Sequence, residues 1–322
     1  MQAEIPDSAS PARWRGRQFH NQPEQSHIHG FLVALWNGVR EETLGRVDIS
    51  VHARNADIPG SDPGALQMLV AGELEFLTLM GGILGQVVPV TEIQGLPFAF
   101  GSTEQVFAVM DGPLGNYLNS EMHARGIYGL PGCCFENGFR QIYGRERPVH
   151  AAADLAGYRM RVPDGRIFID LFTALGAEPV VVNIKQLYQS LASAQVDGQE
   201  NALVVHNVNR LYEVTRYLSV TNHMWSGFNL IANLAFWTRL PGDVRDVIQR
   251  HARRQVEAQR RYTRGENERM LAHLRTCGMI VNNADTDSFR ARLGGDFYRR
   301  WKTQLGATAW NLLEAQVGRL GC

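Results

Sequence analysis

The chain has 322 residues, a length that fits one large or two medium-sized α/β domains rather than one small core. Lys plus Arg and Asp plus Glu both number 32, so no net field draws it to nucleic acid or to an anionic membrane. We find no apolar run of the roughly 18 residues that a membrane-spanning helix needs. The four cysteines show no C-x-x-C spacing, so neither a zinc site nor a redox pair is predicted.

The first part of the chain alternates helices with strands. The stretch "FLVALWNGVREETLGRVDISVH" starts with an apolar stripe at helical spacing from Phe31, which predicts a helix that ends at Gly45. Apolar and polar residues then alternate over 47–51, as in a half-buried strand. A second such pair follows, with Asp62 as a plausible N-cap, Gly72 as the helix end and a strand after it.

The middle of the chain continues this alternation. We expect a helix from 103 to about 125, a strand near 127–130 and then an extended "GFRQIYG". From Asp154 a second α/β unit is predicted, with strands at 158–162, 179–182 and 196–200 and helices at 165–175 and 184–194. Strands that alternate with helices favour parallel pairing and a mostly parallel sheet.

The stretch from Pro241 to about Leu274 reads as one long helix. Its apolar residues recur every four positions between charged ones. At about 1.5 Å per residue such a helix would run on the order of 50 Å, more than the width of one small domain. We therefore expect it to brace two domains.

The candidate binding groups lie where predicted strands end. Arg161 closes the strand of "GYRMRVP", and "DGQEN" at 197–201 closes another. Ligands of open α/β sheets bind outside the carboxyl ends of the strands, where a guanidinium can grip a carboxylate in two parallel hydrogen bonds. The residues alone leave two interpretations equally open for Arg161, a carboxylate clamp or a surface arginine paired to Asp164.

The other polar candidates are weaker taken alone. Arg140 in "GFRQIYG" lies between the two α/β halves, where a structural salt bridge is the better interpretation. "HNQPEQSHIH" offers histidines without further metal ligands at fixed spacing, so loop groups lining a cleft are favoured over a metal site. The usual nucleophile, zinc-protease, phosphate-loop and dinucleotide motifs are absent from the sequence. The chain offers recognition groups without an obvious nucleophile.

Together these segments resemble a known family. The segments that carry the resemblance, from about Arg17 onward, are "ETLGRVDISV", "LPFAF", "GFRQ", "DLAGYRMRVPDG", "ALGAEPVVVNIKQLYQSLASAQVDGQEN" and "LYEVTRYLSVTNH". In their order and spacing they are similar to the periplasmic substrate-binding subunits of TRAP (tripartite ATP-independent periplasmic) transporters, the DctP type.

The resemblance implies an α/β fold of two domains that close like a clamshell. It implies mostly parallel central sheets, hinge strands, and a long helix that spans both domains. Domain I is expected to comprise 15–142 and 223–255, and domain II 143–222 and 256–322. The resemblance also implies a monomer that docks on TRAP membrane subunits, without a cofactor, in the periplasm, with its signal peptide removed from this chain.

The resemblance also assigns site residues. It makes Arg161 the clamp on a ligand carboxylate, with Asn201 beside it and Arg140 reaching the ligand as in several members, and it makes Arg159 a solvated strand residue. Neutral polar groups expected near the cleft are His20, Asn21, Gln22, Gln199 and Asn229. Trp225 and Phe228 either stack on a sugar ring or fill the hinge core.

Two alternatives stay open for the function. The expected ligand is a sugar acid or a similar hydroxylated monocarboxylate, with a C4-dicarboxylate or a 2-oxo acid as the alternative because Arg140 offers a second cation. The rival class is a cytoplasmic enzyme that orients an organic acid with Arg161 and uses His20, His206 or Glu200 as general acid or base. No activated pair is visible in the sequence, which disfavours the enzyme.

Overall fold

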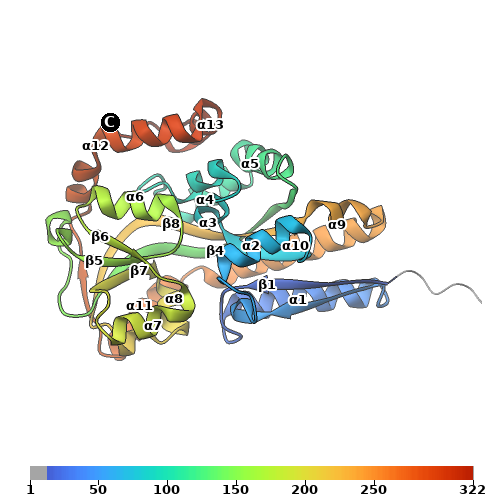
Figure 1. Cartoon of the computed structure of the whole chain (residues 1–322), viewed down its shortest axis with the longest axis horizontal. Coiled ribbons are helices and arrows are strands. Elements are labelled where there is room, and N and C mark those ends of the chain that lie inside the picture. The colour runs from blue at the N-terminus through green and yellow to red at the C-terminus, as the bar shows by residue number, and fades with distance from the viewer. Residues whose placement is uncertain (1–12, 322) are drawn as a thin grey trace, which may run out of the picture.

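The structure, a computed structural model, describes residues 13–321 and contains one mixed sheet of nine strands in that range (Figure 1). The order along the sheet is β2-β1-β3-β8-β4-β7-β5-β6, and β9 pairs with β8. The strands are β1 (Trp14–His20), β2 (Val47–His52), β3 (Phe76–Met80), β4 (Ile127–Gly144), β5 (Arg159–Val162), β6 (Glu178–Val181), β7 (Gly198–Ala202), β8 (Tyr217–Asn233) and β9 (Ile280–Asn283).

Helices cover the sheet on both sides (Figure 1). The α-helices are α1 (His27–Glu42), α2 (Asp62–Ala71), α3 (Gly81–Leu84), α4 (Thr103–Met110), α5 (Pro113–His123), α6 (Arg166–Ala174), α7 (Ile184–Ala192), α8 (Leu203–Val208), α9 (Leu234–Arg239), α10 (Gly242–Thr263), α11 (Glu266–Thr276), α12 (Thr286–Leu305) and α13 (Ala307–Val317). Short 3₁₀ helices are η1 (Ala53–Asn55), η2 (Pro89–Gly95), η3 (Ala152–Leu155) and η4 (Leu211–Glu213). Within 13–321, none of these helices combines the length and the hydropathy needed to cross a bilayer.

The sheet consists of two parallel wings joined by long antiparallel strands. In one wing β1 pairs in parallel with β2 and β3, and in the other β5 pairs in parallel with β6 and β7, as the alternation of helices and strands predicts. The centre was not predicted from the sequence. There β4 (18 residues) and β8 (17 residues) pair antiparallel with each other and with β7 and β3, because each runs through both wings.

Two helices expected to be continuous are broken. The one predicted over 103–125 splits into α4 and α5 at Asp111 and Gly112, because Pro113 lacks the N–H that a helix interior requires. The one predicted over 241–274 splits into α10 and α11 at Gly265, which has a φ of 75°. A left-handed glycine ends a regular helix at that point. Both predictions of unbroken helices are wrong.

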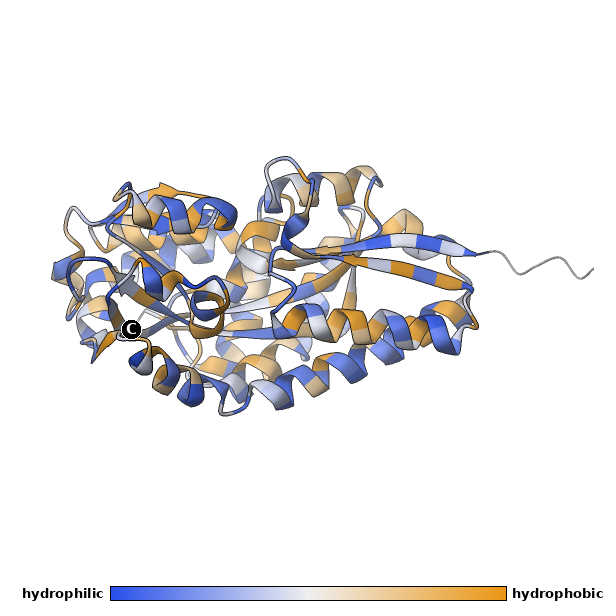
Figure 2. Ribbon diagram, turned by 90° about the horizontal axis from the view of Figure 1, so that it is seen from below, coloured by the Kyte–Doolittle hydropathy of each residue, from blue (hydrophilic) through white to orange (hydrophobic). Residues whose placement is uncertain are grey.

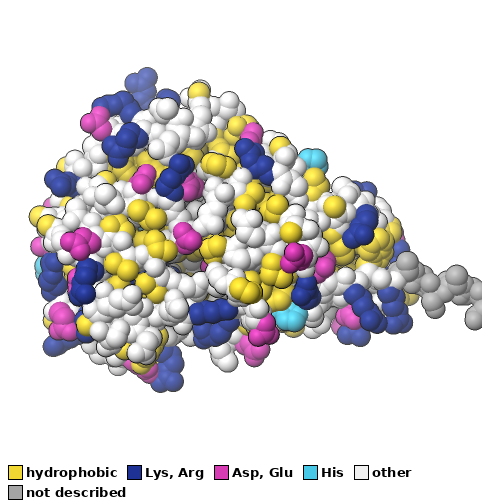
Figure 3. All heavy atoms as spheres, in the orientation of Figure 1, with side chains coloured by type: hydrophobic (Ala, Val, Ile, Leu, Met, Phe, Trp, Pro, Cys, Tyr) yellow, Lys and Arg dark blue, Asp and Glu magenta, His cyan; other side chains and the backbone are white. Residues whose placement is uncertain are grey.

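Helix α10 packs against the sheet through the apolar stripe that the sequence predicts. Four residues on one face of α10 are fully buried: Val244, Ile248, Ala252 and Val256. In Figure 2 orange and blue segments alternate along the helices, as in amphipathic elements. On the face seen in Figure 3, positive and negative side chains are interspersed, in keeping with the zero net charge. Burial of apolar stripes against the sheet therefore organises the fold.

Helix α10 is also hydrogen-bonded to strand β4. The Gln259 side chain, which is fully buried, accepts a hydrogen bond from the Glu136 N–H (2.9 Å) and donates one to the Glu136 carbonyl (2.7 Å). Beyond Glu136 the β4–β8 register shifts. The Trp225 indole N–H donates to Glu136 Oε1 (2.8 Å), whereas the buried Oε2 of Glu136 has no partner among the described residues.

We expect Glu136 to make stability fall as pH rises. Burial raises the pKa of Glu136 to about 7 from 4.5, so between these values the folded state binds more protons than the unfolded state. The free energy of unfolding should therefore drop by about 3 kcal/mol from pH 4.5 to 7 through this group and then level off. Chemical denaturation at pH 5 and pH 8 measures the drop, and it should largely disappear in Glu136→Gln.

The matched control is Glu257→Gln, at an exposed position of α10. It should keep the drop seen in the wild type. An equal pH dependence in the wild type and Glu136→Gln would contradict this prediction.

Candidate functional site

A small cavity of about 20 Å³ lies between the two wings. The residues that line it come from the loop after β1, from the start of α2, from strands β3, β4, β5, β7 and β8, and from α7, α8 and the loop after β5; most are buried. They are Asn21, Gln22, Asp62, Met80, Asn137, Arg140, Arg161, Pro163, Ile184, Asn201, Val205 and Phe228. The carboxyl ends of β1, β5 and β7 meet here, at the position where open α/β sheets bind ligands.

Arg161 is the arginine of the cavity whose guanidinium keeps hydrogen-bond donors free for a ligand. Its side chain is 2% exposed, and its Nε donates to the Val182 carbonyl (2.8 Å). No acceptor in the described part of the chain meets its terminal guanidinium nitrogens. Burial lowers the pKa of Arg161 to about 10, still well above neutral pH, so the guanidinium stays charged. It is a buried positive fork that faces a cavity, which is the geometry that holds a carboxylate.

Arg140 already has a carboxylate partner. Its Nε and one terminal nitrogen both bind the Glu200 carboxylate, the latter at 2.7 Å, and the pair is fully buried. His223 lies 3.4 Å from the same carboxylate. Burial acts to raise the pKa of Glu200, but the Arg140 charge with its hydrogen bonds and His223 holds the pKa below its usual value. Arg140 thus lines the cavity as half of an internal ion pair.

Asp62 adds a buried carboxylate opposite the arginines. Its two oxygens accept from Asn21 Nδ2 (2.8 Å) and Asn55 Nδ2 (2.7 Å), and Gln22 Nε2 in turn donates to Asn21 Oδ1 (2.7 Å). Burial raises the pKa of Asp62, and these hydrogen bonds together with the Arg161 charge oppose the rise. This network holds acceptors and donors in fixed positions around the cavity.

Polar contacts cross from one wing to the other beside the cavity. Lys185 Nζ donates to the Asn55 carbonyl (2.9 Å), and Asn183 Nδ2 donates to the Gly60 carbonyl (3.4 Å). Asn183 is also the N-cap of α7, so its amide oxygen holds the helix start while its nitrogen reaches across. These contacts keep the two wings together around the cavity.

The comparison with protein families decides which family the chain belongs to. Residues 19–302 match the DctP family, described as bacterial extracellular solute-binding protein, family 7. The chain belongs to this solute-binding family. Its members bind small organic acids outside the cytoplasm as the substrate-binding subunits of TRAP transporters and are not enzymes.

Individual relatives and solved structures resemble the chain over most of its length. The chain is 33% identical over 252 residues to the uncharacterized protein y4mM of Sinorhizobium fredii, covering 78% of this chain and 46% of that longer protein. It is 30% identical over 242 residues to the C4-dicarboxylate-binding periplasmic protein DctP of Rhodobacter capsulatus. That match covers 73% of this chain and 70% of the relative. The structure is also similar to a crystal structure of a TRAP periplasmic solute-binding protein from a Polaromonas species, bound to D-erythronate. The two superimpose with a TM-score of 0.88 at 27% sequence identity, and the match covers 94% of this chain and 99% of that one.

The structure brings together most of the side chains predicted for the site of this DctP-family chain. The predicted residues that line the cavity are Arg161, Asn201, Arg140, Asn21, Gln22 and Phe228. Arg159 lies on the same strand as Arg161 but is partly exposed and paired with Asp197. The alternative that Arg161 is a surface residue paired to Asp164 is wrong, because Arg161 is buried.

Two predicted ligand contacts lie elsewhere. Trp225 does not line the cavity: it donates to Glu136 and packs edge-to-face on Phe100 and Phe107, so it fills the core. Gln199 lies beneath Asn201, accepts from its Nδ2 (3.2 Å), and is hydrogen-bonded to His206 (3.0 Å). It supports a cavity residue rather than lining the cavity itself.

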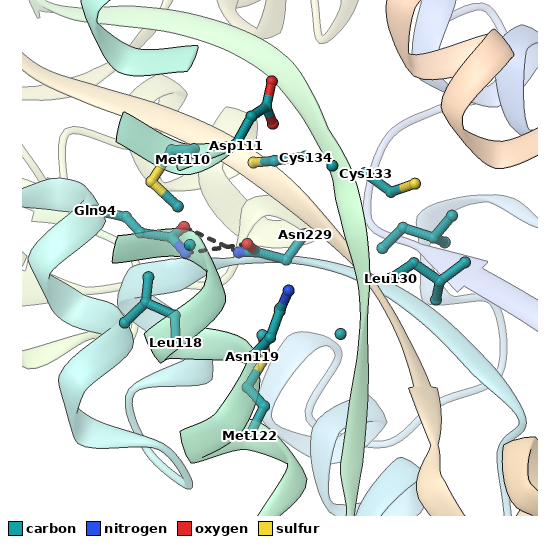
Figure 4. A pocket seen from close by; sticks show the side chains of 14 residues that line it. Gln94, Met110, Asp111, Leu118, Asn119, Met122, Leu130, Cys133, Cys134 and Asn229 are labelled. Carbon is teal, nitrogen blue, oxygen red and sulfur yellow. Dashed lines mark hydrogen bonds between the residues drawn. The ribbon is translucent and has the colours of Figure 1, made fainter. Parts of the chain in front are cut away.

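Asn229, expected near the cleft, lies in a different hollow (Figure 4). There it exchanges two hydrogen bonds of 3.0 Å with Gln94. Strand alternation explains these placements, since Trp225 and Asn229 lie four residues apart on one face of β8 while Phe228 lies on the other. The even spacing of Trp225 and Asn229 along one strand is the signal that places them on the same face.

The groups named for an enzyme are not available for proton transfer in the cavity. Burial lowers the pKa of His20 to about 3, and its ring is paired with His29. His206 is stacked on Tyr143, and burial holds its pKa far below the usual value. Glu200 is held by Arg140. Nor does the region 13–321 contain a cluster of three or more His, Cys, Asp or Glu side chains placed to hold a metal ion.

Sequence reasoning missed two polar residues of the cavity. Asp62 was expected to cap α2, but Ser61 is the N-cap and Asp62 points into the cavity network. Asn137 comes directly before Gly138, which has a φ of 107°, in the "ENGFRQ" segment. The short-range pattern gives no sign of either role, because the hydrogen bonds of Asp62 to Asn21 and of Asn137 to Ser226 join residues far apart in the sequence.

Proposed function

We propose that the chain is the periplasmic receptor of a TRAP transporter that captures a hydroxylated monocarboxylate, such as a sugar acid, and delivers it to the membrane subunits. The observation that carries the proposal is the unpaired guanidinium of Arg161 in a buried cavity. A carboxylate there forms a charge-assisted, bidentate pair where water is excluded. Relatives that bind D-erythronate and C4-dicarboxylates support an organic acid as the ligand class.

The charges of the cavity favour one carboxylate over two. Arg161 is free to pair with a ligand, whereas Arg140 is committed to Glu200. A second carboxylate would lie close to Asp62 without a free cation, which costs free energy in a low-dielectric site. Neutral hydroxyls, by contrast, find donors and acceptors in Asn21, Gln22, Asn201 and Asp62.

We propose the two lobes to be 15–142 with 223–255 and 143–222 with 256–322, joined through β4 and β8. Ligand binding then closes one lobe on the other, and contacts such as Lys185 to Asn55 hold the closed form. We propose that the protein acts as a monomer. A binding protein of this kind returns its ligand unchanged, so turnover of any acid that it binds would contradict the proposal.

The test is calorimetry with D-erythronate and succinate, after unfolding and refolding the protein to remove any ligand that it carried. We expect D-erythronate or another sugar acid to bind at least about tenfold more tightly than succinate, a difference of about 1.4 kcal/mol. Tighter binding of succinate would make the C4-dicarboxylate alternative the correct one. If neither these acids nor a wider panel of 2-oxo and sugar acids binds, the proposed function is wrong.

A further inference from the structure

A second, larger hollow lies beside the ligand cavity. It has a volume of about 560 Å³ and opens to solvent, and we call it the side recess. It lies between the loop before α1, the start of α4, strand β4, helix α8 and the junction of α10 with α11. The residues that line it are Gln25, His27, Thr103, Glu104, Glu136, Asn137, Gly138, Val204, Asn207, Val208, Arg260, Tyr262, Thr263, Arg264, Gly265, Glu266, Asn267 and Met270.

The side recess adjoins the cavity along several segments. On α8, Val205 lines the cavity while its neighbour Val204 lines the recess. In the loop after β1, Gln22 lines the cavity and Gln25 the recess. Asn137 lines both, and no other described residue does. The two hollows are therefore neighbours, and the Asn137 side chain stands between them.

The short side chain of Asn137 is part of the partition between the two hollows. Asn137 is 5% exposed, and its Nδ2 donates to Ser226 Oγ (2.9 Å). Ser226 Oγ in turn donates to the Gly138 carbonyl (3.3 Å) and lies 3.4 Å from a guanidinium nitrogen of Arg140. One hydrogen bond, without an ion pair, therefore fixes the Asn137 side chain. Shortening it thins the partition and leaves Ser226 with its other partners.

The recess has the chemistry of a site for sugar hydroxyls. Hydroxyl and amide side chains line it, among them Thr103, Asn207 and Asn267, and Tyr262 adds an aromatic ring. Glu136 adds a carboxyl group at the edge of the recess; it is 4% exposed, and its Oε2 is buried without a hydrogen-bond partner among the described residues. Once a turn of the side chain exposes it, that oxygen would accept a hydrogen bond from a hydroxyl of a neutral polyol.

We propose that Asn137 sets the length of the acid that the cavity accepts, and that the side recess is a latent subsite for the neutral polyol end of a longer sugar acid. This inference rests on the proposed function, because it takes the acid end to be held at Arg161. Asn137 acts as a specificity-determining residue: with its side chain in place the ligand ends at the partition, and without it the ligand extends toward Glu136.

The experiment measures the binding of two acids to the wild type and to Asn137→Ala by calorimetry. D-erythronate is the short acid, and lactobionate, an aldonate that carries a galactosyl group, is the long one. We expect Asn137→Ala to raise the affinity for lactobionate relative to D-erythronate by at least about tenfold over the wild-type ratio. Asn137→Ser, which also shortens the side chain, serves as the second variant and should raise the ratio in the same direction.

A filled recess provides the control. Val208→Trp places a bulky ring in the recess from the end of α8, outside the cavity. Added to Asn137→Ala, it should cancel the gain for lactobionate, whereas alone it should leave the binding of D-erythronate unchanged. An unchanged ratio in both Asn137 variants, with D-erythronate bound by the wild type, would overturn this inference alone. Failure of the wild type to bind any acid would instead overturn the proposed function.

Discussion

Arg161→Ala is expected to lose most of the ligand affinity, by about 2–5 kcal/mol or roughly 30- to 5000-fold in Kd. The substitution removes a charge-assisted bidentate pair from a buried cavity and leaves the ligand carboxylate without a counter-charge. The neighbouring cation cannot replace it, because Arg140 is bound to Glu200. Isothermal titration calorimetry with the best-binding acid measures the loss.

Arg159→Ala is the matched control on the same strand. Its side chain is 43% exposed and pairs with Asp197 at the surface, so its removal should change Kd less than about threefold. Arg161→Lys should also bind poorly, because a single ammonium does not reproduce the planar fork of donors. An affinity of Arg161→Ala within threefold of the wild type would show that the carboxylate binds elsewhere.

Loss of the ligand must be separated from loss of the fold. Arg161 has no carboxylate partner within hydrogen-bonding distance among the described residues, so Arg161→Ala removes a buried charge and should leave the unliganded protein at least as stable as the wild type. Denaturation without ligand tests this directly. A large drop in stability would assign Arg161 a structural role as well.

Glu200→Ala is expected to lower the free energy of unfolding of the unliganded protein by about 3–5 kcal/mol. It leaves the Arg140 guanidinium, which is 1% exposed, without a counter-charge in the centre of the sheet. It also removes the partner of His223. Urea denaturation followed by circular dichroism measures the change.

Two comparisons identify the cause of that loss. Glu213→Ala breaks an exposed ion pair with Arg210 and should cost less than about 1 kcal/mol. Removal of both partners, in Arg140→Met with Glu200→Leu, should recover part of the loss because no unpaired charge remains buried. If Glu200→Ala costs no more than Glu213→Ala, the pair does not stabilise the fold.

Local pattern was sufficient for many elements of this protein. The apolar stripes and their end signals predicted α1, strands β2 and β3 of one wing, strands β5, β6 and β7 of the other, and α7. The order of short motifs then identified the family, which no single element does. An arginine at a strand end made the carboxylate clamp one of two open interpretations of Arg161, and only the resemblance to the family favoured it.

The sequence by itself determined the stripes, the caps, the zero net charge and the set of polar groups at the strand ends. The tertiary structure decided how those groups pair. In the folded protein Arg140 is paired with Glu200, and Asp62 is a hydrogen-bond acceptor at the cavity rather than the helix cap. Trp225 lies in the core. Such pairings join residues 40 or more positions apart, and they depend on how distant segments approach one another in the fold. Local periodicity carries no information about that approach, since it reports which face is buried and not which distant group buries it.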